Sequence, residues 1–156
     1  MRLTLALLII VVFLLPSPHV HGGGKKTYGD LEGVVYIVNY DGDTIRVDIP
    51  GVHPLFGANI PVRLRGMDAP EIRAECQTEK KMALDAKERV KRLLEKAEHI
   101  TLRETGRDKY FRIVARVVAD GVDVGDMLLK EGLAVPYDGG RKDKAWCIED
   151  TVNSRP

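Results

Sequence analysis

The spacing of apolar residues changes twice along this chain, and that change restricts the fold more than any other feature. Five stretches have the alternation, or the β-branched and aromatic content, that is typical of strands. They are residues 33–40, 44–49, 60–67, 100–104 and 112–119. From Thr78 the period becomes three to four over about 20 residues, which predicts an amphipathic helix with Thr78 as its N-cap. Residues 123–131 predict a short helix that Asp123 caps.

Strands that predominate around one long helix indicate a small barrel or an α+β domain and exclude a doubly wound parallel sheet. A length of 156 residues is enough for one domain with its own core. A five-stranded barrel with a helix between its third and fourth strands is the oligonucleotide-binding architecture. We therefore expect an α+β, mainly β domain over residues 31–138, built as such a barrel with one long and one short helix.

The N-terminus has the three-part pattern of a secretory signal, with a positively charged start, the apolar run 3–15 and small residues before a cleavage point. The run is shorter than the roughly 20 residues that a bilayer-spanning helix needs, although an uncleaved anchor stays an alternative. We expect a signal peptide over 1–22, a flexible linker over 23–30 and a C-terminal tail over 139–156. The protein would then be secreted or periplasmic, without stable membrane association after cleavage.

The charge is unevenly distributed along the chain, although its formal net value is only +1. Residues 63–116 carry 15 basic and 10 acidic side chains, a difference of +5, whereas both flanking parts are net acidic. An anionic partner would therefore bind the middle of the chain, and its binding should weaken with salt. The alternative is that these charges form the solvated face of the long helix.

Two cysteines, Cys76 and Cys147, remain after export. In an oxidising compartment such a pair can form a disulfide, which here would close a loop of about 70 residues, worth on the order of 4 kcal/mol. A zinc site is the competing interpretation, but the sequence has no CxxC and no nearby histidine pair. We therefore favour the disulfide.

Acidic residues gather at the ends of the predicted strands. They are Asp41, Asp43, Asp68 and Glu71. Carboxylate oxygens are hard ligands, so a cluster of them prefers calcium or magnesium to zinc. Arg63 and Arg112 stand on two of the strands, and two guanidinium groups could clamp one phosphodiester. The alternatives are ordinary turn chemistry for the carboxylates and ordinary surface positions for the arginines.

Three segments together resemble the thermonuclease (staphylococcal-nuclease-like) family, in its order and roughly its spacing. They are Val38-Asn39-Tyr40-Asp41-Gly42-Asp43-Thr44, Val62-Arg63-Leu64-Arg65-Gly66-Met67-Asp68-Ala69-Pro70-Glu71 and Asp108-Lys109-Tyr110-Phe111-Arg112. The resemblance runs from about residue 33 to residue 137. It implies a calcium-dependent nuclease that hydrolyses DNA and RNA, preferably single-stranded or denatured. Such an enzyme cleaves the P–O5′ bond and leaves 3′-phosphate ends, and we expect a monomer.

The resemblance also assigns roles to individual positions. It gives Asp43, Asp68 and the backbone carbonyl of Ala69 to the calcium ion, Glu71 to the general base, Arg63 and Arg112 to the phosphate, and Lys109, Tyr110 and Tyr137 to the substrate. The family usually has threonine where this chain has Ala69, so weaker calcium binding is expected. The loop 50–59 is also longer than the family's hairpin. A non-catalytic barrel that binds single strands or a protein partner is the alternative function.

Overall fold

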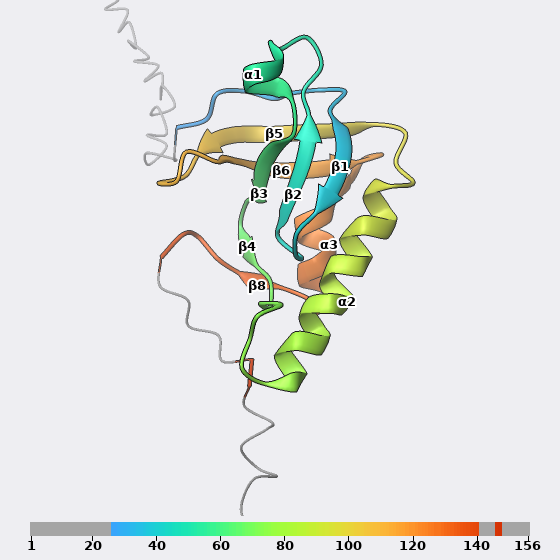
Figure 1. Cartoon of the computed structure of the whole chain (residues 1–156), viewed down its shortest axis with the longest axis vertical. Helices are drawn as coiled ribbons and strands as arrows, with labels where there is room; N and C mark the ends of the chain where they lie inside the picture. Colours follow the sequence, from blue (N-terminus) through green and yellow to red (C-terminus); the bar gives the residue numbers. More distant parts are fainter. Residues whose placement is uncertain (1–25, 141–145, 148–156) are drawn as a thin grey trace, which may run out of the picture.

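A computed structural model describes residues 26–140 and 146–147 (Figure 1). The predicted signal peptide 1–22 lies outside the described residues, as do the first residues of the predicted linker and most of the predicted tail. None of the helices in the described part of the chain is long and apolar enough to cross a membrane.

The described residues form a mixed sheet and three helices, which confirms the α+β class. The strands are β1 (Val35–Asn39), β2 (Thr44–Asp48), β3 (Ile60–Leu64), β4 (Met67–Asp68), β5 (Ile100–Arg107), β6 (Ile113–Ala119), β7 (Val122–Asp123) and β8 (Val135–Pro136). The helices are α1 (Pro54–Gly57), α2 (Gln77–Leu94) and α3 (Val124–Lys130). Two small strands, β4 and β8, pair with each other beside the main sheet.

The main sheet runs in the order β1-β2-β3-β6-β5, with β7 attached to β6. All its pairs are antiparallel except β3 with β6, which is parallel. The segment before β1 meets β5 at the far end of this order, through an isolated bridge between Leu31 and Leu102 and a hydrogen bond from Val34 N–H to the Ile100 carbonyl (3.2 Å). Five strands closed into a barrel were expected; five strands do follow one another in this order, but the described strands do not form one continuous closed barrel.

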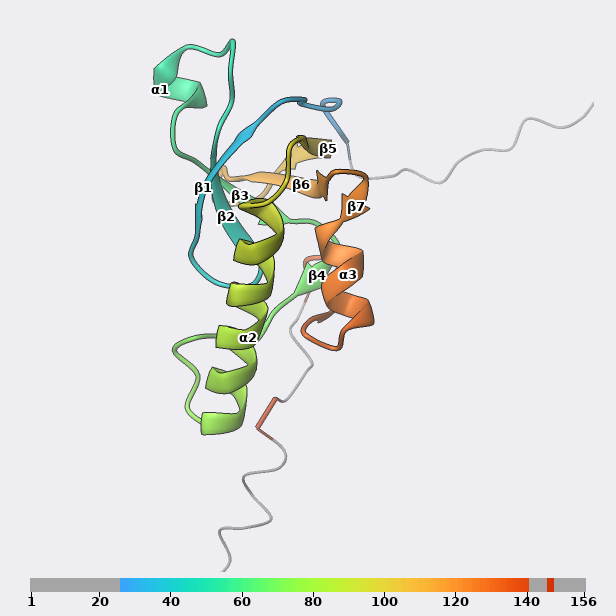
Figure 2. The same ribbon diagram turned by 90° about the vertical axis from the view of Figure 1, so that its right-hand side faces the viewer.

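The core lies between the inner face of the sheet and the two longer helices. Alternation places Ile45 and Val47 of β2 inward, whereas Arg46 between them is only half-buried. Val90 of α2 and Leu128 of α3 contribute to the same buried cluster. Figure 2 shows α2 and α3 side by side against the sheet. Burial of these apolar side chains is the main force that fixes the strands and helices relative to one another.

Three local expectations were wrong. The N-cap of α2 is Cys76 rather than Thr78, because the Cys76 backbone is extended and its Sγ accepts the Glu79 N–H. Sulfur is a weak acceptor, so sequence reasoning favoured the nearby hydroxyl. The predicted loop 50–59 contains α1, which His53 caps through its ring nitrogen. The described part of the chain therefore contains three helices rather than the two expected.

Gly42, in the turn between β1 and β2, lies very close to two other elements. A Cβ at this position would be 2.8 Å from the Cβ of Ala86 in α2 and 2.9 Å from the Cβ of Ala69 after β4. Both distances are shorter than nonbonded carbon atoms tolerate, so only glycine fits without a shift. The contact fixes the turn that carries Asp43 against the segment that carries Asp68.

Candidate active site

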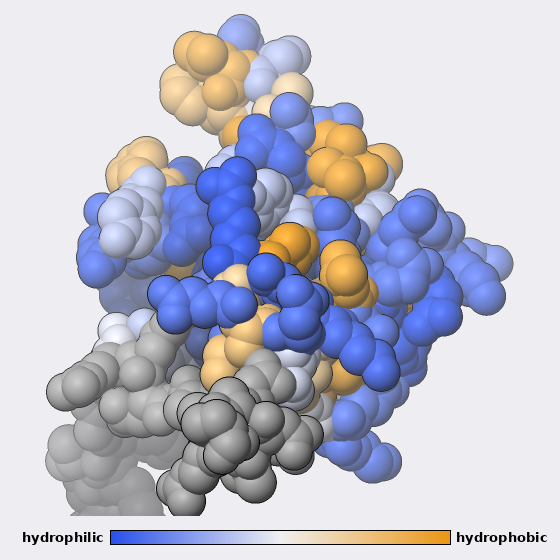
Figure 3. All heavy atoms as spheres, turned by 60° about the horizontal axis from the view of Figure 1, so that its bottom comes forward, coloured by the Kyte–Doolittle hydropathy of each residue, from blue (hydrophilic) through white to orange (hydrophobic). Residues whose placement is uncertain are grey.

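A cleft of about 1360 Å³ opens beside the paired strands β4 and β8, between β3 and the loop after β5. Six of the nine residues that sequence analysis assigned to the active site line it. They are Arg63, Asp68, Lys109, Tyr110, Arg112 and Tyr137. Asp43, Ala69 and Glu71 are not among the lining residues. Figure 3 shows that one face of the molecule is mostly hydrophilic, with small apolar patches between the charged side chains.

Asp43 and Asp68 are both buried, with 3% and 4% of their surface exposed. They share one cation, because Arg63 Nη1 pairs with Asp43 Oδ1 and Arg63 Nη2 donates to Asp68 Oδ1 at 2.7 Å. The other oxygen of Asp43 accepts the backbone N–H of Ala69 at 3.2 Å. The sheet register thus brings two carboxylates that are 25 positions apart in sequence to one guanidinium.

This cluster fits a hard cation. Two buried carboxylates and one guanidinium carry a net negative charge, and burial makes such a charge costly unless a further cation compensates it. Carboxylate and carbonyl oxygens are the ligands that calcium prefers. The described residues offer one other compact group, Cys76, Glu79 and Cys147, but its sulfur atoms are bonded to each other and are not thiolate ligands.

Asp41 has a different role from its neighbour. Its Oδ1 accepts the backbone N–H groups of Asp43 (3.0 Å) and Thr44 (2.8 Å), as an aspartate at the start of a turn does. The Asp41 carboxylate therefore has the turn-forming role that the sequence analysis gave as the alternative to metal binding. Asp41 therefore shapes the turn that presents Asp43.

Arg112 lines the cleft and is held by Asp108. The Asp108 carboxylate accepts one hydrogen bond from the Arg112 Nε–H (2.8 Å) and one from the Arg112 backbone N–H (2.9 Å). Partial burial would raise the pKa of the Asp108 carboxyl, but the hydrogen bonds from Arg112 and from the Tyr110 backbone outweigh this effect and lower it. Lys109 Nζ and the Arg112 guanidinium lie 5.0 and 5.7 Å from the centre of the Tyr110 ring. The exposed Tyr110 ring is thus surrounded by cations, an arrangement suited to an anionic ligand with flat bases.

Tyr137 lines the cleft because β8, which directly precedes it, pairs with β4. Its backbone N–H donates to the Gly66 carbonyl (3.0 Å), and its hydroxyl donates to the Gly140 carbonyl (2.7 Å). Sequence spacing alone could not place it, since residues 66 and 137 lie far apart in the chain. The two predicted tyrosines therefore line one cleft.

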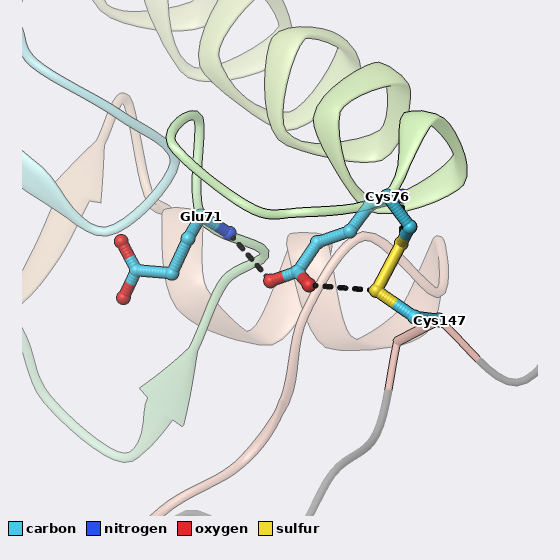
Figure 4. Close-up of a disulfide and its surroundings, with 4 residues drawn as sticks. Glu71, Cys76 and Cys147 are labelled. Atoms are coloured by element: carbon cyan, nitrogen blue, oxygen red, sulfur yellow. Dashed lines mark hydrogen bonds between the residues drawn. A yellow bond between two sulfur atoms is a disulfide. The ribbon is translucent and has the colours of Figure 1, made fainter.

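Glu71 follows the buried Pro70 and is itself exposed. Its backbone N–H donates to Glu79 Oε1 at 3.0 Å. Figure 4 shows the Glu71 side chain pointing away from the disulfide that joins Cys76 to Cys147, the pairing considered in the sequence analysis. The Cα atoms of the two cysteines are 5.8 Å apart.

A family model described as staphylococcal nuclease homologue matches residues 61–151, more than half of the chain. The chain belongs to this family. No curated protein matches the chain. The staphylococcal nuclease homologue domain has the oligonucleotide-binding fold, so the sheet described above belongs to that class. Membership indicates a nuclease or a nucleic-acid-binding module, and the matched range contains Arg63, Asp68, Glu71, Arg112 and Tyr137.

Two residues of the site were missed by the sequence analysis. Arg65 lines the cleft, and its Nη2 donates to the Glu104 carbonyl at 2.7 Å. The alternation of Arg63 and Arg65 in the predicted strand 60–67 was the signal that could have identified it, although β3 itself ends at Leu64. Glu79, which accepts the Glu71 N–H, had no comparable signal, because the contact depends on how the chain turns between the two residues.

Proposed function

We propose that this protein is an exported, calcium-dependent nuclease that hydrolyses phosphodiester bonds of DNA and RNA. The observation that carries the proposal is one cleft lined both by Arg63, which pairs with the buried Asp43 and Asp68, and by Arg112, which directly precedes β6. Family membership supports nucleic acid as the substrate class. The apolar N-terminal run and the Cys76–Cys147 disulfide support export.

In the proposed reaction, the two arginines and Glu71 would have different roles. The guanidinium groups of Arg63 and Arg112 bind the phosphate and stabilise the negative charge that develops on it. Glu71 accepts a proton from a water molecule whose oxygen then bonds to phosphorus. The P–O5′ bond breaks, the O5′ oxygen takes a proton from solvent, and the phosphate stays on the 3′ end. Proton transfer to a positioned base is typically worth about 10²–10⁴-fold in rate.

Asp43, Asp68 and the carbonyl of Ala69 would hold the calcium ion. When bound, the ion would supply positive charge that lowers the barrier to attack by water. Arg63 lines the cleft while it pairs with both aspartates, so it would bind the phosphate next to the calcium ligands. The lost threonine hydroxyl next to Asp68 supports a weaker calcium affinity than the family norm.

The decisive experiment is digestion of heat-denatured DNA by the purified chain in calcium, in magnesium and in chelator. We expect activity with calcium, little with magnesium, because that smaller ion demands tight octahedral coordination, and none with chelator. Glu71→Gln, which removes only the proton acceptor, serves as the catalytic control and should lose at least about 100-fold in rate.

Each result distinguishes between the candidate functions. Binding of the DNA without digestion in any metal would support the alternative, a non-catalytic oligonucleotide-binding module. Full activity in chelator would contradict the calcium site. Analysis of the product ends would test the proposed cleavage of the P–O5′ bond.

A further inference from the structure

Glu79, in the first turn of α2, contacts both the candidate base and the disulfide. Its Oε1 accepts the backbone N–H of Glu71 at 3.0 Å, and its Oε2 lies 3.5 Å from Cys147 Sγ. Its own backbone N–H donates to Cys76 Sγ at 3.5 Å. The dashed lines in Figure 4 mark the contacts of the Glu79 carboxylate with the Glu71 N–H and with Cys147 Sγ. The Glu79 carboxylate thus lies between the segment of Glu71 and the disulfide.

The backbone of Glu71 is held from two directions. On its N-terminal side, Asp68, Ala69 and Pro70 are buried, and the proline ring restricts the backbone further. On its C-terminal side the chain has neither helix nor strand until α2 begins. Glu79 is the side chain that reaches back across this stretch. The Glu71 carbonyl also accepts the Ala74 N–H at 3.1 Å, which closes a local turn. The Glu79 contact ties this turn to α2, and each such contact reduces the orientations that the exposed Glu71 can adopt.

We propose that Glu79 is a positioning residue for Glu71 and that the Cys76–Cys147 disulfide fixes the start of α2, from which Glu79 reaches Glu71. This inference rests on the proposed function, because it assumes that Glu71 is the general base. Cys76 is the N-cap of α2 and accepts the Glu79 N–H, and its bond to Cys147 restrains this first turn, from which the Glu79 carboxylate accepts the Glu71 N–H. The disulfide thus braces the segment that carries Glu71.

A base that is displaced slows proton transfer but leaves the arginines that bind the phosphate untouched. The loss should therefore appear in kcat rather than in KM. A residue with only a structural role in α2 would not produce this pattern. Because Glu79 acts through Glu71, its removal should also have no further effect once Glu71 has lost its carboxylate.

The first experiment compares Glu79→Ala with Glu79→Gln, which keeps an oxygen able to accept the Glu71 N–H. We expect Glu79→Ala to lower kcat about tenfold with KM within about twofold, as the loss of one hydrogen bond of the base segment would. Glu79→Gln should keep most of the activity. Asp85→Ala, an exposed acidic residue further along α2, is the matched control and should behave as the parent.

The second experiment repeats Glu79→Ala in the Glu71→Gln background. We expect no additional loss of kcat there. The proposal is overturned if the two losses multiply, if Glu79→Gln is as slow as Glu79→Ala, or if only KM changes. Near-parental kcat in Glu79→Ala would overturn it equally.

A third measurement does not depend on activity, namely hydrogen exchange of the Glu71 amide followed by NMR. The amide should exchange at least about tenfold faster in Glu79→Ala and in the double variant Cys76→Ser, Cys147→Ser, in which serine keeps the N-cap but removes the tether. Unchanged protection in both variants overturns the bracing role. If protection depends on Glu79 while Glu71→Gln stays fully active, the bracing stands and the proposed function fails.

Discussion

At the scale of single residues, Arg63 is the side chain on which the candidate site depends most. It pairs with two buried aspartates and also lines the cleft, so the same guanidinium contributes to the folded state and would contact a ligand bound in the cleft. Arg112 is held by a single carboxylate, that of Asp108, which is more exposed than either partner of Arg63. The two arginines of the proposed phosphate clamp therefore differ in what they contribute to stability.

Arg63→Ala is expected to destabilise the fold in chelator by about 3 kcal/mol, because it leaves two buried carboxylates without their cation. Calcium should restore part of that loss, since it binds the folded state at the same carboxylates. Urea denaturation with calcium and with chelator measures both effects. Arg112→Ala is the matched control and should cost less than about 1 kcal/mol, as expected for a partly exposed pair. Equal losses for the two variants would contradict this account of Arg63.

At the scale of elements, the turn between β1 and β2 is fixed by the absence of a side chain at Gly42. Gly42→Ala should destabilise the protein by about 1–3 kcal/mol, because the new Cβ would overlap Ala86 of α2 and Ala69. Calcium affinity should fall as well, since the clash moves Asp43 away from Asp68. Gly140→Ala is the control, because its new Cβ would lie 3.4 Å from Asp138 Oδ1, an ordinary contact distance. Denaturation and calcium calorimetry together test the prediction, and a fully stable Gly42→Ala would refute the close approach.

The C-terminal end of α3 is joined to α2 by a paired contact of Arg89 with Glu131, with distances of 2.7–3.1 Å. The hydrogen bonds from Arg89 lower the pKa of the Glu131 carboxyl. A carboxyl whose pKa is lower in the folded chain than in the unfolded chain stabilises the fold at pH values above the unfolded pKa. The stabilisation by the Arg89–Glu131 pair is therefore lost as the pH falls through the pKa of Glu131 in the folded chain.

Glu131→Gln should accordingly cost less than about 1 kcal/mol near neutral pH, and its difference from the parent should vanish in acid. Denaturation at a series of pH values checks this. Glu95→Gln, which removes the long and exposed contact with Lys91 (3.9 Å), is the control and should have a smaller effect at every pH. A Glu131→Gln deficit that persisted unchanged in acid would show that the ion pair is not its cause.

Most elements could be predicted because their residues alternate or repeat locally. The strands around Ile45 and Val62 and the helix around Val90 show their buried faces directly in the sequence. The parallel pairing of β3 with β6, the β4–β8 pair and the contact of Glu79 with Glu71 join distant positions, which no local pattern encodes. For the same reason, family resemblance rather than periodicity identified the residues that share the cleft.

At the scale of the whole molecule, the excess of positive charge in residues 63–116 is divided between the cleft and α2. Arg63, Arg65, Arg107, Lys109 and Arg112 line the cleft, whereas Lys91 lies on the outer part of α2. The alternative considered from the sequence, a solvated helix face, therefore accounts for some of these charges. The remainder surround the site at which a phosphate chain would bind.

Binding of a single-stranded oligonucleotide in chelator should weaken steeply with salt, with a slope of log K against log salt of about −0.7 for each phosphate neutralised. Lys109→Gln should reduce that slope by roughly one such contact. Lys91→Gln removes the same charge outside the cleft and should leave the slope unchanged. Fluorescence anisotropy at several salt concentrations provides the measurement, and equal slopes for the two variants would contradict binding in the cleft.

The bridge between Leu31 and Leu102 has a consequence for processing of the N-terminus. Residues 28–34 donate and accept backbone hydrogen bonds along β5, whose outer edge would otherwise be open to another chain. An open edge strand is a template for intermolecular pairing and aggregation. Removal of a leader before Tyr28 leaves this cover intact, whereas trimming beyond Val34 would expose Leu102 and its neighbours. Expression of this protein should therefore preserve residues 28–34, so that the edge of β5 stays covered.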